Sequence, residues 1–256
     1  EYRRQRQMCI RDSTITVTVP YTVSLNGASA TVEFTPSAKI MPDPATISDW
    51  DTERTFRITS FNGQAHDYTY LVIKDEIRSK GNVELKTPAE IVSFAATGTS
   101  IIKGDLVIGS DSDDAEKIKD ISALGMLKEI EGNIIIRNSY TGGTLTGLDN
   151  ITKIGGLSIG SEENSAANET LEMVSMTKLN EVTGNIHVYN NGVKFVQFDL
   201  LKAIEGDFVI SSSTLATLQI PELINVGGAL NIFGMGKGAI STLVFPKVQT
   251  LSLIHI

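Results

Sequence analysis

Six copies of a short pattern decide the fold: 102-IKGDLVI-108, 130-IEGNIII-136, 154-IGGLSI-159, 182-VTGNIHV-188, 204-IEGDFVI-210 and 226-VGGALNI-232. The repeating unit is apolar-x-Gly-[Asp/Asn]-apolar-x-apolar, and the third copy is one residue short. The first strand anchors are Leu106, Ile134, Leu157, Ile186, Phe208 and Leu230. The spacings between them are 28, 23, 29, 22 and 22 residues, which are the lengths of leucine-rich coils with insertions in the longer ones.

Five units also carry an apolar-x-x-apolar second half: 145-LTGL-148, 171-LEMV-174, 195-FVQF-198, 215-LATL-218 and 240-ISTL-243. One coil cannot bury its inward side chains, whereas stacked coils share a core and pair each strand with the next coil's strand. We expect the glycine to permit a sharp bend, and the Asp or Asn beside it to bond local backbone amides. The repeat predicts a β-solenoid over residues 81–250.

The segment 87-TPAE-90 supplies a start for this stack. Thr87 is placed as the N-cap, Pro88 occupies the first helical position, and Glu90 completes a capping box. We therefore expect a helix near 88–96 that covers the first coil and ends before Gly98, with a strand at 83–85 ahead of it. No equivalent cap follows the last coil, and we expect the natural chain to continue beyond residue 250.

Residues 13–80 have a different pattern. Period-two alternation predicts strands at 14–19, 30–34, 55–60 and 68–73, with a turn at Asn62-Gly63. The stretch 35–44 holds three prolines, which cannot donate to a sheet ladder, so we expect a loop or an edge there. Short strands separated by turns predict a small antiparallel β-sandwich.

The two ends differ from both regions. The string 1-EYRRQRQMCIRDS-13 is basic and polar without a strand or helix period, and the chain stops abruptly at 251-LSLIHI-256. Both strings resemble translated sequencing-adapter read-through. We expect 1–12 and 251–256 to be artefactual tails, which makes Cys9 non-native and leaves the true N-terminus missing. A natural basic tail is the alternative.

Composition excludes several classes of protein. The 256 residues carry 22 basic and 30 acidic side chains, and the net charge of −8 argues against a nucleic-acid partner. The single cysteine excludes an internal disulfide and a multi-cysteine metal site. No apolar run approaches the roughly 18 residues of a membrane span, so we expect membrane attachment only through an anchor outside this fragment.

Two resemblances follow from these strings. The first region, with ITVTVPY, ATVEFTPSAKIMPDP, FRITSFNG and YTYLVI, resembles the immunoglobulin-like modules of surface lipoproteins in gut anaerobes, which implies a stalk. The second, with GDLVI, GNIII, GGLSI, GNIHV, GDFVI and LQIPELINVGG, resembles the receptor L-domain family. That resemblance implies a right-handed, leucine-rich-like β-solenoid of the kind found in growth-factor receptors, fungal wall proteins and bacterial surface proteins. The cysteines of the receptor members' disulfide modules are absent.

The sequence offers little chemistry. His66 and His187 have no second His or Cys at ligand spacing, and His255 lies in the suspect tail. Ser212 and Ser213 lack a nucleophile elbow, and 234-GMGKG-238 lacks the ending of a phosphate loop. The loop with Asp111, Asp113 and Asp114 is a weak calcium candidate, because it has neither the glycine nor the glutamate of a calcium-binding hand. A solvated loop is the alternative, also for Glu162-Glu163.

Surface positions just after the coil strands remain as candidates for binding a ligand: Tyr140, Tyr189, Asn190 and Phe233, with corner packing as the alternative. We therefore expect a non-enzymatic cell-surface binding or adhesion protein, without a cofactor, whose partner is a protein or glycan. A structural spacer within a larger surface protein is the alternative, and a carbohydrate-active enzyme on a β-solenoid is a minor one.

Overall fold

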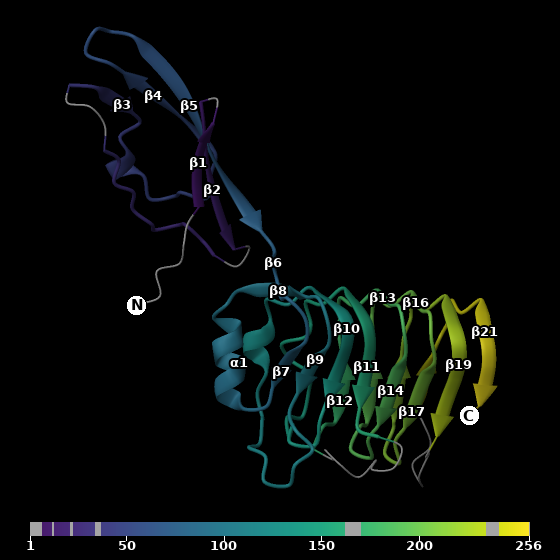
Figure 1. Ribbon diagram of the computed structural model, residues 1–256. Coiled ribbons are helices and arrows are strands. Elements are labelled where there is room, and N and C mark those ends of the chain that lie inside the picture. The colour runs from purple at the N-terminus through teal and green to yellow at the C-terminus, as the bar shows by residue number, and fades with distance from the viewer. Residues whose placement is uncertain are drawn as a thin grey trace. The chain divides into compact units, whose positions relative to one another are not determined.

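The computed structural model describes residues 7–11, 13–20, 23–33, 37–161, 170–233 and 241–255. These residues are mainly β, as predicted, and include a single α-helix. The chain divides into two compact units, Glu1–Ile77 and Arg78–Ile256 (Figure 1). The sequence placed this boundary at residue 80.

The first unit contains one five-stranded sheet with the strand order β1-β2-β5-β4-β3. Its members are β1 (Gln7–Arg11), β2 (Thr14–Pro20), β3 (Lys39–Met41), β4 (Arg54–Thr59) and β5 (Ala65–Asp75). The β4–β5 hairpin turns at Asn62-Gly63 as predicted, with a positive φ of 82° at Gly63. The short β3 lies in the proline-rich stretch and forms an edge of the sheet, also as predicted.

Two expectations for this unit are wrong. Strands β2 and β5 run parallel, with Thr14 opposite Thr69, so the sheet is mixed rather than antiparallel. Residues 30–33 form no strand, and Phe34 lies outside the described residues. Only Ala30 of this stretch packs against the core, while Thr31, Val32 and Glu33 are exposed, so the alternation has no buried face there and joins no ladder.

Irregular chain completes the core of the first unit. Trp50 comes from a non-strand segment, and its ring centroid lies 5.2 Å from that of Tyr70 and 6.0 Å from that of Phe56. The Tyr70 hydroxyl donates to the Trp50 carbonyl at 2.8 Å. Leu25, from another irregular segment, is also buried. One short turn of 3₁₀-helix, η1 (Pro44–Thr46), follows β3.

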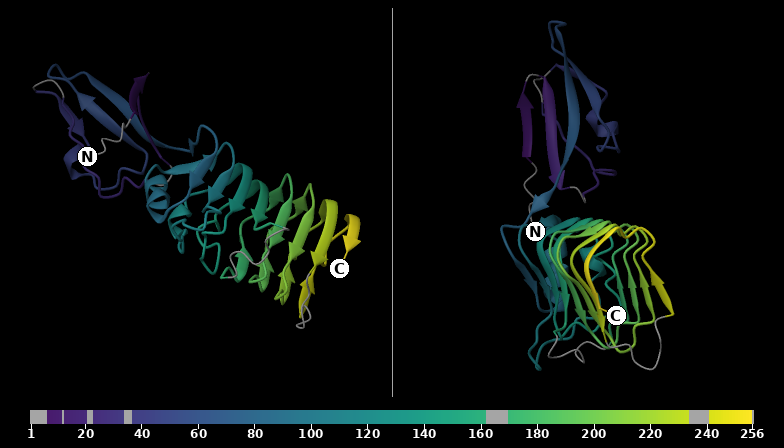
Figure 2. Two further views of the ribbon diagram at one scale, coloured as in Figure 1. Left: turned by 60° about the horizontal axis from the view of Figure 1, so that its bottom comes forward. Right: turned by 90° about the vertical axis from the view of Figure 1, so that its right-hand side faces the viewer.

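The second unit is a stack of chain turns joined by parallel strands, which Figure 2 shows side by side along the stack. The longer sheet has twelve strands: β6 (Ile77–Arg78), β7 (Val83–Leu85), β8 (Thr99–Ile102), β9 (Leu106–Ile108), β10 (Glu129–Ile136), β11 (Lys153–Ile159), β13 (Glu181–Val182), β14 (Ile186–Tyr189), β16 (Ala203–Ile204), β17 (Phe208–Ser211), β19 (Asn225–Phe233) and β21 (Thr250–His255).

The six copies of the repeat pair in register within this sheet. Leu106 lies opposite Ile134, which lies opposite Leu157, and the series continues through Ile186, Phe208 and Leu230. All six side chains are buried. The anchors predicted from the sequence therefore form one apolar column through the core.

A second parallel sheet contains the second halves of the later units. Its strands are β12 (Met173–Ser175), β15 (Phe195–Gln197), β18 (Thr217–Gln219) and β20 (Thr242–Val244), in that order. The central residues of the first three strands, Val174, Val196 and Leu218, are buried and contribute to the same core as the repeat anchors, whereas Leu243 of β20 is exposed.

The helix α1 (Pro88–Ala95) packs against β7 and the short 3₁₀-helix η2 (Ser122–Leu124). Its predicted capping box is confirmed: the Thr87 side chain accepts from the Glu90 amide, and the Glu90 carboxylate accepts from the Thr87 amide. Gly98 follows with a positive φ of 71° and donates its N–H to Ala95. Strand β7 has the predicted bounds.

The sequence suggested that the Asp and Asn residues of the repeat bond local amides, but Asp105, Asn185 and Asp207 bond between coils instead. Each of these three, like Asn82 ahead of the first copy, accepts a hydrogen bond from the backbone N–H of the equivalent residue one coil later. The pairs are Asp105 to Asn82 at 2.9 Å, Asn133 to Asp105 at 2.7 Å, Asp207 to Asn185 at 2.8 Å and Ala229 to Asp207 at 2.7 Å. These bonds form a ladder between coils, which we call the Asx ladder.

The ladder also explains the repeat glycines, for which the expected reason was wrong. Gly104, Gly132, Gly206 and Gly228 are not among the positive-φ residues, so no special bend requires them. A Cβ atom on Gly206 would instead lie 2.1 Å from Oδ1 of Asn185 in the preceding coil. Each glycine therefore provides the space into which the previous coil's ladder side chain fits.

Both suspect ends contain a strand, where no regular structure was expected. Strand β1 pairs antiparallel with β2, with Cys9 opposite Thr16. Strand β21 pairs parallel with β19, with Leu253 opposite Ala229. Apolar and β-branched residues recur in both strings closely enough to extend an existing sheet edge. Whether these strings belong to the native protein stays a prediction.

Candidate functional site

The candidate site lies on the outer face of the twelve-stranded sheet, because alternate residues of its strands point away from the core. In β14, Ile186 and Val188 are buried, while His187 and Tyr189 are half-buried. Figure 1 places α1 beside β7, at the start of the stack and away from β14, β17 and β19. No helix among the described residues covers these three strands, although parallel sheets usually have both faces covered.

The strand register brings six outward side chains together, and we call them the outward patch. His187 lies opposite Val209, which lies opposite Asn231; Tyr189 lies opposite Ser211, which lies opposite Phe233. Neighbouring strands are about 4.8 Å apart, so Tyr189 and Phe233 start about 10 Å from each other. The outward patch consists of His187, Tyr189, Val209, Ser211, Asn231 and Phe233.

The chemistry of the outward patch is aromatic and polar without a carboxylate or an ammonium group. The rings of His187 and Tyr189 meet edge to face, with centroids 6.0 Å apart. Phe233 is 46% exposed, whereas Val209 is only 6% exposed and lies on β17, between His187 of β14 and Asn231 of β19. The side-chain oxygen of Asn231 is buried and has no hydrogen-bond partner among the described residues.

Two of the four predicted ligand residues are buried at corners of the stack instead. Tyr140 is 1% exposed, its hydroxyl donates to the Thr144 carbonyl, and burial raises the pKa of its phenol, with a smaller contribution from Asp120. Asn190 is fully buried and accepts a 2.8 Å hydrogen bond from the Gly192 amide. Corner packing, the alternative for this set, is therefore correct for Tyr140 and Asn190.

The acidic loop does not assemble a calcium site. Asp111 accepts a 2.7 Å bond from the Arg137 guanidinium and a 3.1 Å bond from the Asn138 amide, so it ties its loop to the next coil. Asp113 and Asp114 are exposed to solvent. No group of three His, Cys, Asp or Glu side chains in the described ranges is arranged to hold a metal ion. Glu162 and Glu163 lie outside the described residues.

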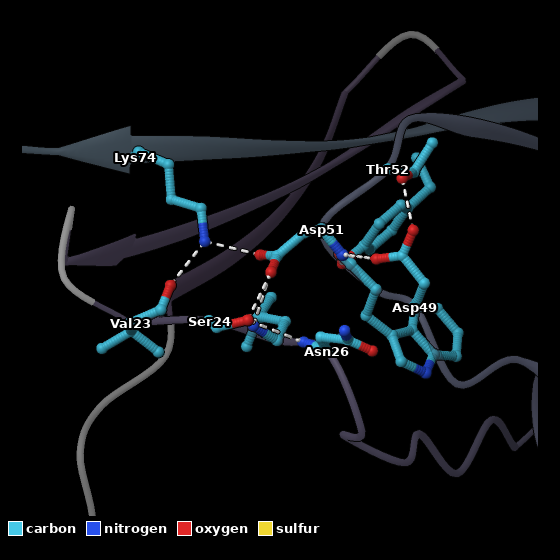
Figure 3. Close-up of polar contacts among 10 residues, drawn as sticks. Val23, Ser24, Asn26, Asp49, Asp51, Thr52 and Lys74 are labelled. Atoms are coloured by element: carbon cyan, nitrogen blue, oxygen red, sulfur yellow. Dashed lines mark hydrogen bonds and ion pairs between the residues drawn. The ribbon is translucent and has the colours of Figure 1, made fainter.

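A second cluster of polar groups, in the first unit, is structural. Figure 3 shows the Lys74 ammonium pointing at both the Val23 carbonyl and Asp51, with an Nζ–Oδ1 distance of 2.5 Å. Asp51 also accepts from the Ser24 hydroxyl at 2.8 Å and the Leu25 amide at 2.9 Å. The bond from Lys74, followed by that from Ser24, lowers the pKa of Asp51 to about 2. These contacts fasten irregular chain to β5.

The first unit also contains an open cavity of about 480 Å³ beside its edge strand β3. Its walls are residues 30–32, 39–41 and 43–45, and most of them are apolar. His66, the other histidine considered above, lies on β5, bonded to Ser13 and 5.0 Å from the Tyr68 ring. Neither feature brings together groups for catalysis.

Sequence reasoning identified Tyr189 and Phe233 but missed Val209 and Ser211 between them. The signal was present, because Tyr189, Ser211 and Phe233 are separated by 22 residues each, the length of the last coils. Reading outward positions at that period places all three in one column. Ser212, by contrast, turns inward, and its buried hydroxyl donates a 2.7 Å hydrogen bond to the Val193 carbonyl.

No helix in the part of the chain that the structure describes is long and apolar enough to cross a membrane. No protein-family model matches this chain, and no curated protein matches it.

Proposed function

We propose that this chain is a non-enzymatic cell-surface binding or adhesion protein, which presents the outer face of its twelve-stranded sheet to a protein or glycan. In this proposal the second unit is a right-handed, leucine-rich-like solenoid of L-domain type. The first unit is an immunoglobulin-like module that serves as a stalk. The protein needs no cofactor for this role.

One observation carries the proposal: the outer face of a long parallel sheet is free of any described helix and bears half-buried apolar and aromatic side chains. Burying such side chains against a partner is favourable by roughly 25 cal/mol per Å² of apolar surface. Regular strand spacing fixes the separation of the backbone positions that carry these side chains, so little backbone freedom is lost on binding.

The experiment is to screen the full chain against an array of glycans and a panel of extracellular proteins. Two variants probe the face: Ser158→Lys on β11 and Ser211→Lys on β17 each place a long charged side chain at an outward position. Gln219→Lys, at an outward position of β18 in the second sheet, is the matched control. We expect a ligand at micromolar concentration whose binding is weakened by at least one face variant and not by the control.

Two outcomes would contradict the proposal. If no ligand of either class binds, a structural spacer becomes the better account of the chain. If Gln219→Lys weakens binding as much as the face variants do, the ligand lies elsewhere on the molecule. Circular dichroism of each variant separates loss of binding from loss of folding.

A further inference from the structure

The outward patch has a geometry that discriminates between ligands. Tyr189 and Phe233 stand in one register column, two strands or about 10 Å apart, and the short side chain of Ser211 lies between them. Two rings at this separation with a small residue between them suit a chain of small rings that contacts each aromatic in turn. We infer that the outward patch binds a neutral oligosaccharide, whose sugar rings stack on Tyr189 and Phe233.

This inference rests on the proposed function and narrows it to one ligand class and six residues. A sugar ring has an apolar face and a polar rim, and the patch has side chains that suit each of them. Its C–H face is apolar and packs on an aromatic face, whereas its hydroxyl rim needs donors and acceptors nearby. The Ser211 hydroxyl, the Tyr189 phenol and the His187 ring supply such groups beside the aromatic rings.

Charge argues against anionic ligands. Nucleic acids and acidic glycans are bound through Lys and Arg, and the outward patch contains neither. The ionic groups on β11 and β13 pair with each other instead, with Lys153 Nζ 2.6 Å from Glu181 Oε1. Size argues against a protein partner on this patch alone, since a stable protein interface uses about 20–30 residues on each side.

The test uses the full chain and neutral gluco-, manno-, galacto- and xylo-tetrasaccharides, with an oligogalacturonate as the acidic arm and an unstructured peptide as the protein arm. Binding is measured by calorimetry and by saturation transfer from the protein to the sugar protons. We expect at least one neutral tetrasaccharide to bind. Tyr189→Ala and Phe233→Ala should each weaken it about tenfold, the value of one aromatic stacking contact of roughly 1.4 kcal/mol.

Phe195→Ala is the matched control, because Phe195 is 38% exposed at an outward position of β15 in the other sheet. Tyr189→Phe keeps the ring and should retain most of the affinity. The far-ultraviolet spectrum and the unfolding midpoint of each variant report on folding independently of binding.

The outcomes separate this inference from the proposed function. Neutral sugar binding that survives both Tyr189→Ala and Phe233→Ala overturns the inference and leaves the proposed function standing. Binding only to the acidic sugar, the peptide or a protein of the wider panel does the same. Absence of every ligand overturns both. If Phe195→Ala loses sugar binding as the patch variants do, the loss is not specific to the outward patch, and the inference is overturned.

Discussion

The two units of this chain build their buried cores differently, one from repeated contacts and the other from unique contacts. The second unit repeats the same apolar column and the same hydrogen-bond ladder from one coil to the next. The first builds its core from three different aromatic rings and fastens it with unique contacts, such as that between Lys74 and Val23, which are 51 residues apart in sequence. A repeated contact leaves a period in the sequence, whereas a unique contact leaves none.

The largest expected effect comes from removing a side chain from the apolar column. Phe208 is fully buried between Ile186 and Leu230, so Phe208→Ala should destabilise the second unit by about 3–5 kcal/mol. The single tryptophan, Trp50, lies in the first unit, so its fluorescence reports on that unit, while far-ultraviolet circular dichroism reports mainly on the second. Urea unfolding should show a shifted dichroism midpoint and an unchanged fluorescence midpoint.

The converse variant sharpens the same comparison. Phe56→Ala removes one ring of the aromatic cluster and should move the fluorescence midpoint while leaving the dichroism midpoint in place. If either variant moves both midpoints together, the two units unfold as one and the contrast between them does not extend to their stability.

The next effect tests the space that the repeat glycines provide. Gly206→Ala places a methyl group 2.1 Å from Oδ1 of Asn185 and 2.7 Å from the Gly184 carbonyl, and should cost about 1–3 kcal/mol. Gly143→Ala is the control, because the nearest atom to its Cβ is 3.7 Å away. Both are followed by urea unfolding. Equal midpoints for the two variants would refute the steric account of the glycines.

The Asx ladder itself should contribute less per rung. Asn185→Ala leaves the Asp207 amide without its acceptor and should cost about 1 kcal/mol. Asn185→Asp keeps an acceptor oxygen, as Asp105 and Asp207 do in their own coils, and should cost clearly less than the alanine variant. A reversed order, with the aspartate variant the weaker, would mean that charge rather than the hydrogen bond governs this position. Urea midpoints decide between the two.

The smallest effect concerns pH and the first unit. The pKa of Asp51 is about 2 in the folded chain, against an ordinary value of 3.8. A lowered folded pKa stabilises the folded state above the ordinary value, and that stabilisation is lost as the pH falls from about 4 towards 2. The fluorescence midpoint of the wild-type chain should therefore fall across this window. Asp51→Asn should be less stable at neutral pH and show a flatter profile; an equally steep profile would exclude Asp51 as the cause.

How much the sequence could predict follows from this contrast. The anchors from Leu106 to Leu230, the strand at Val83–Leu85 and the capping box at Thr87 were all predictable, because each depends on residues close together or on a fixed period. The parallel pairing of β2 with β5 was not, because it joins residues 55 apart, such as Thr14 and Thr69, without a repeat to mark it.

The candidate site shows the same limit at smaller scale. Tyr140 and Tyr189 both follow a coil strand in the sequence, yet one hydroxyl turns inward to Thr144 and the other ring points outward beside His187. The difference depends on local geometry: Gly142 leaves the space that the Tyr140 ring occupies, since a Cβ there would lie 2.3 Å from its hydroxyl oxygen. Only coordinates distinguish such corners.

The pairing of a ladder side chain with the glycine of the following coil has a consequence for how such a chain can change in length. The coil with Gly206 and Asp207 has both halves of this pairing, because Gly206 leaves room for Asn185 of the coil before and Asp207 fits against Gly228 of the coil after. Coils of this kind, cut at the Gly-Asx pair, are therefore interchangeable. Duplicating or deleting a whole coil preserves each joint, whereas a shift of one residue breaks two. The short third copy, where Gly156 has no side chain to offer, is also where the register between β10 and β11 shifts, between Ile130 and Asn133.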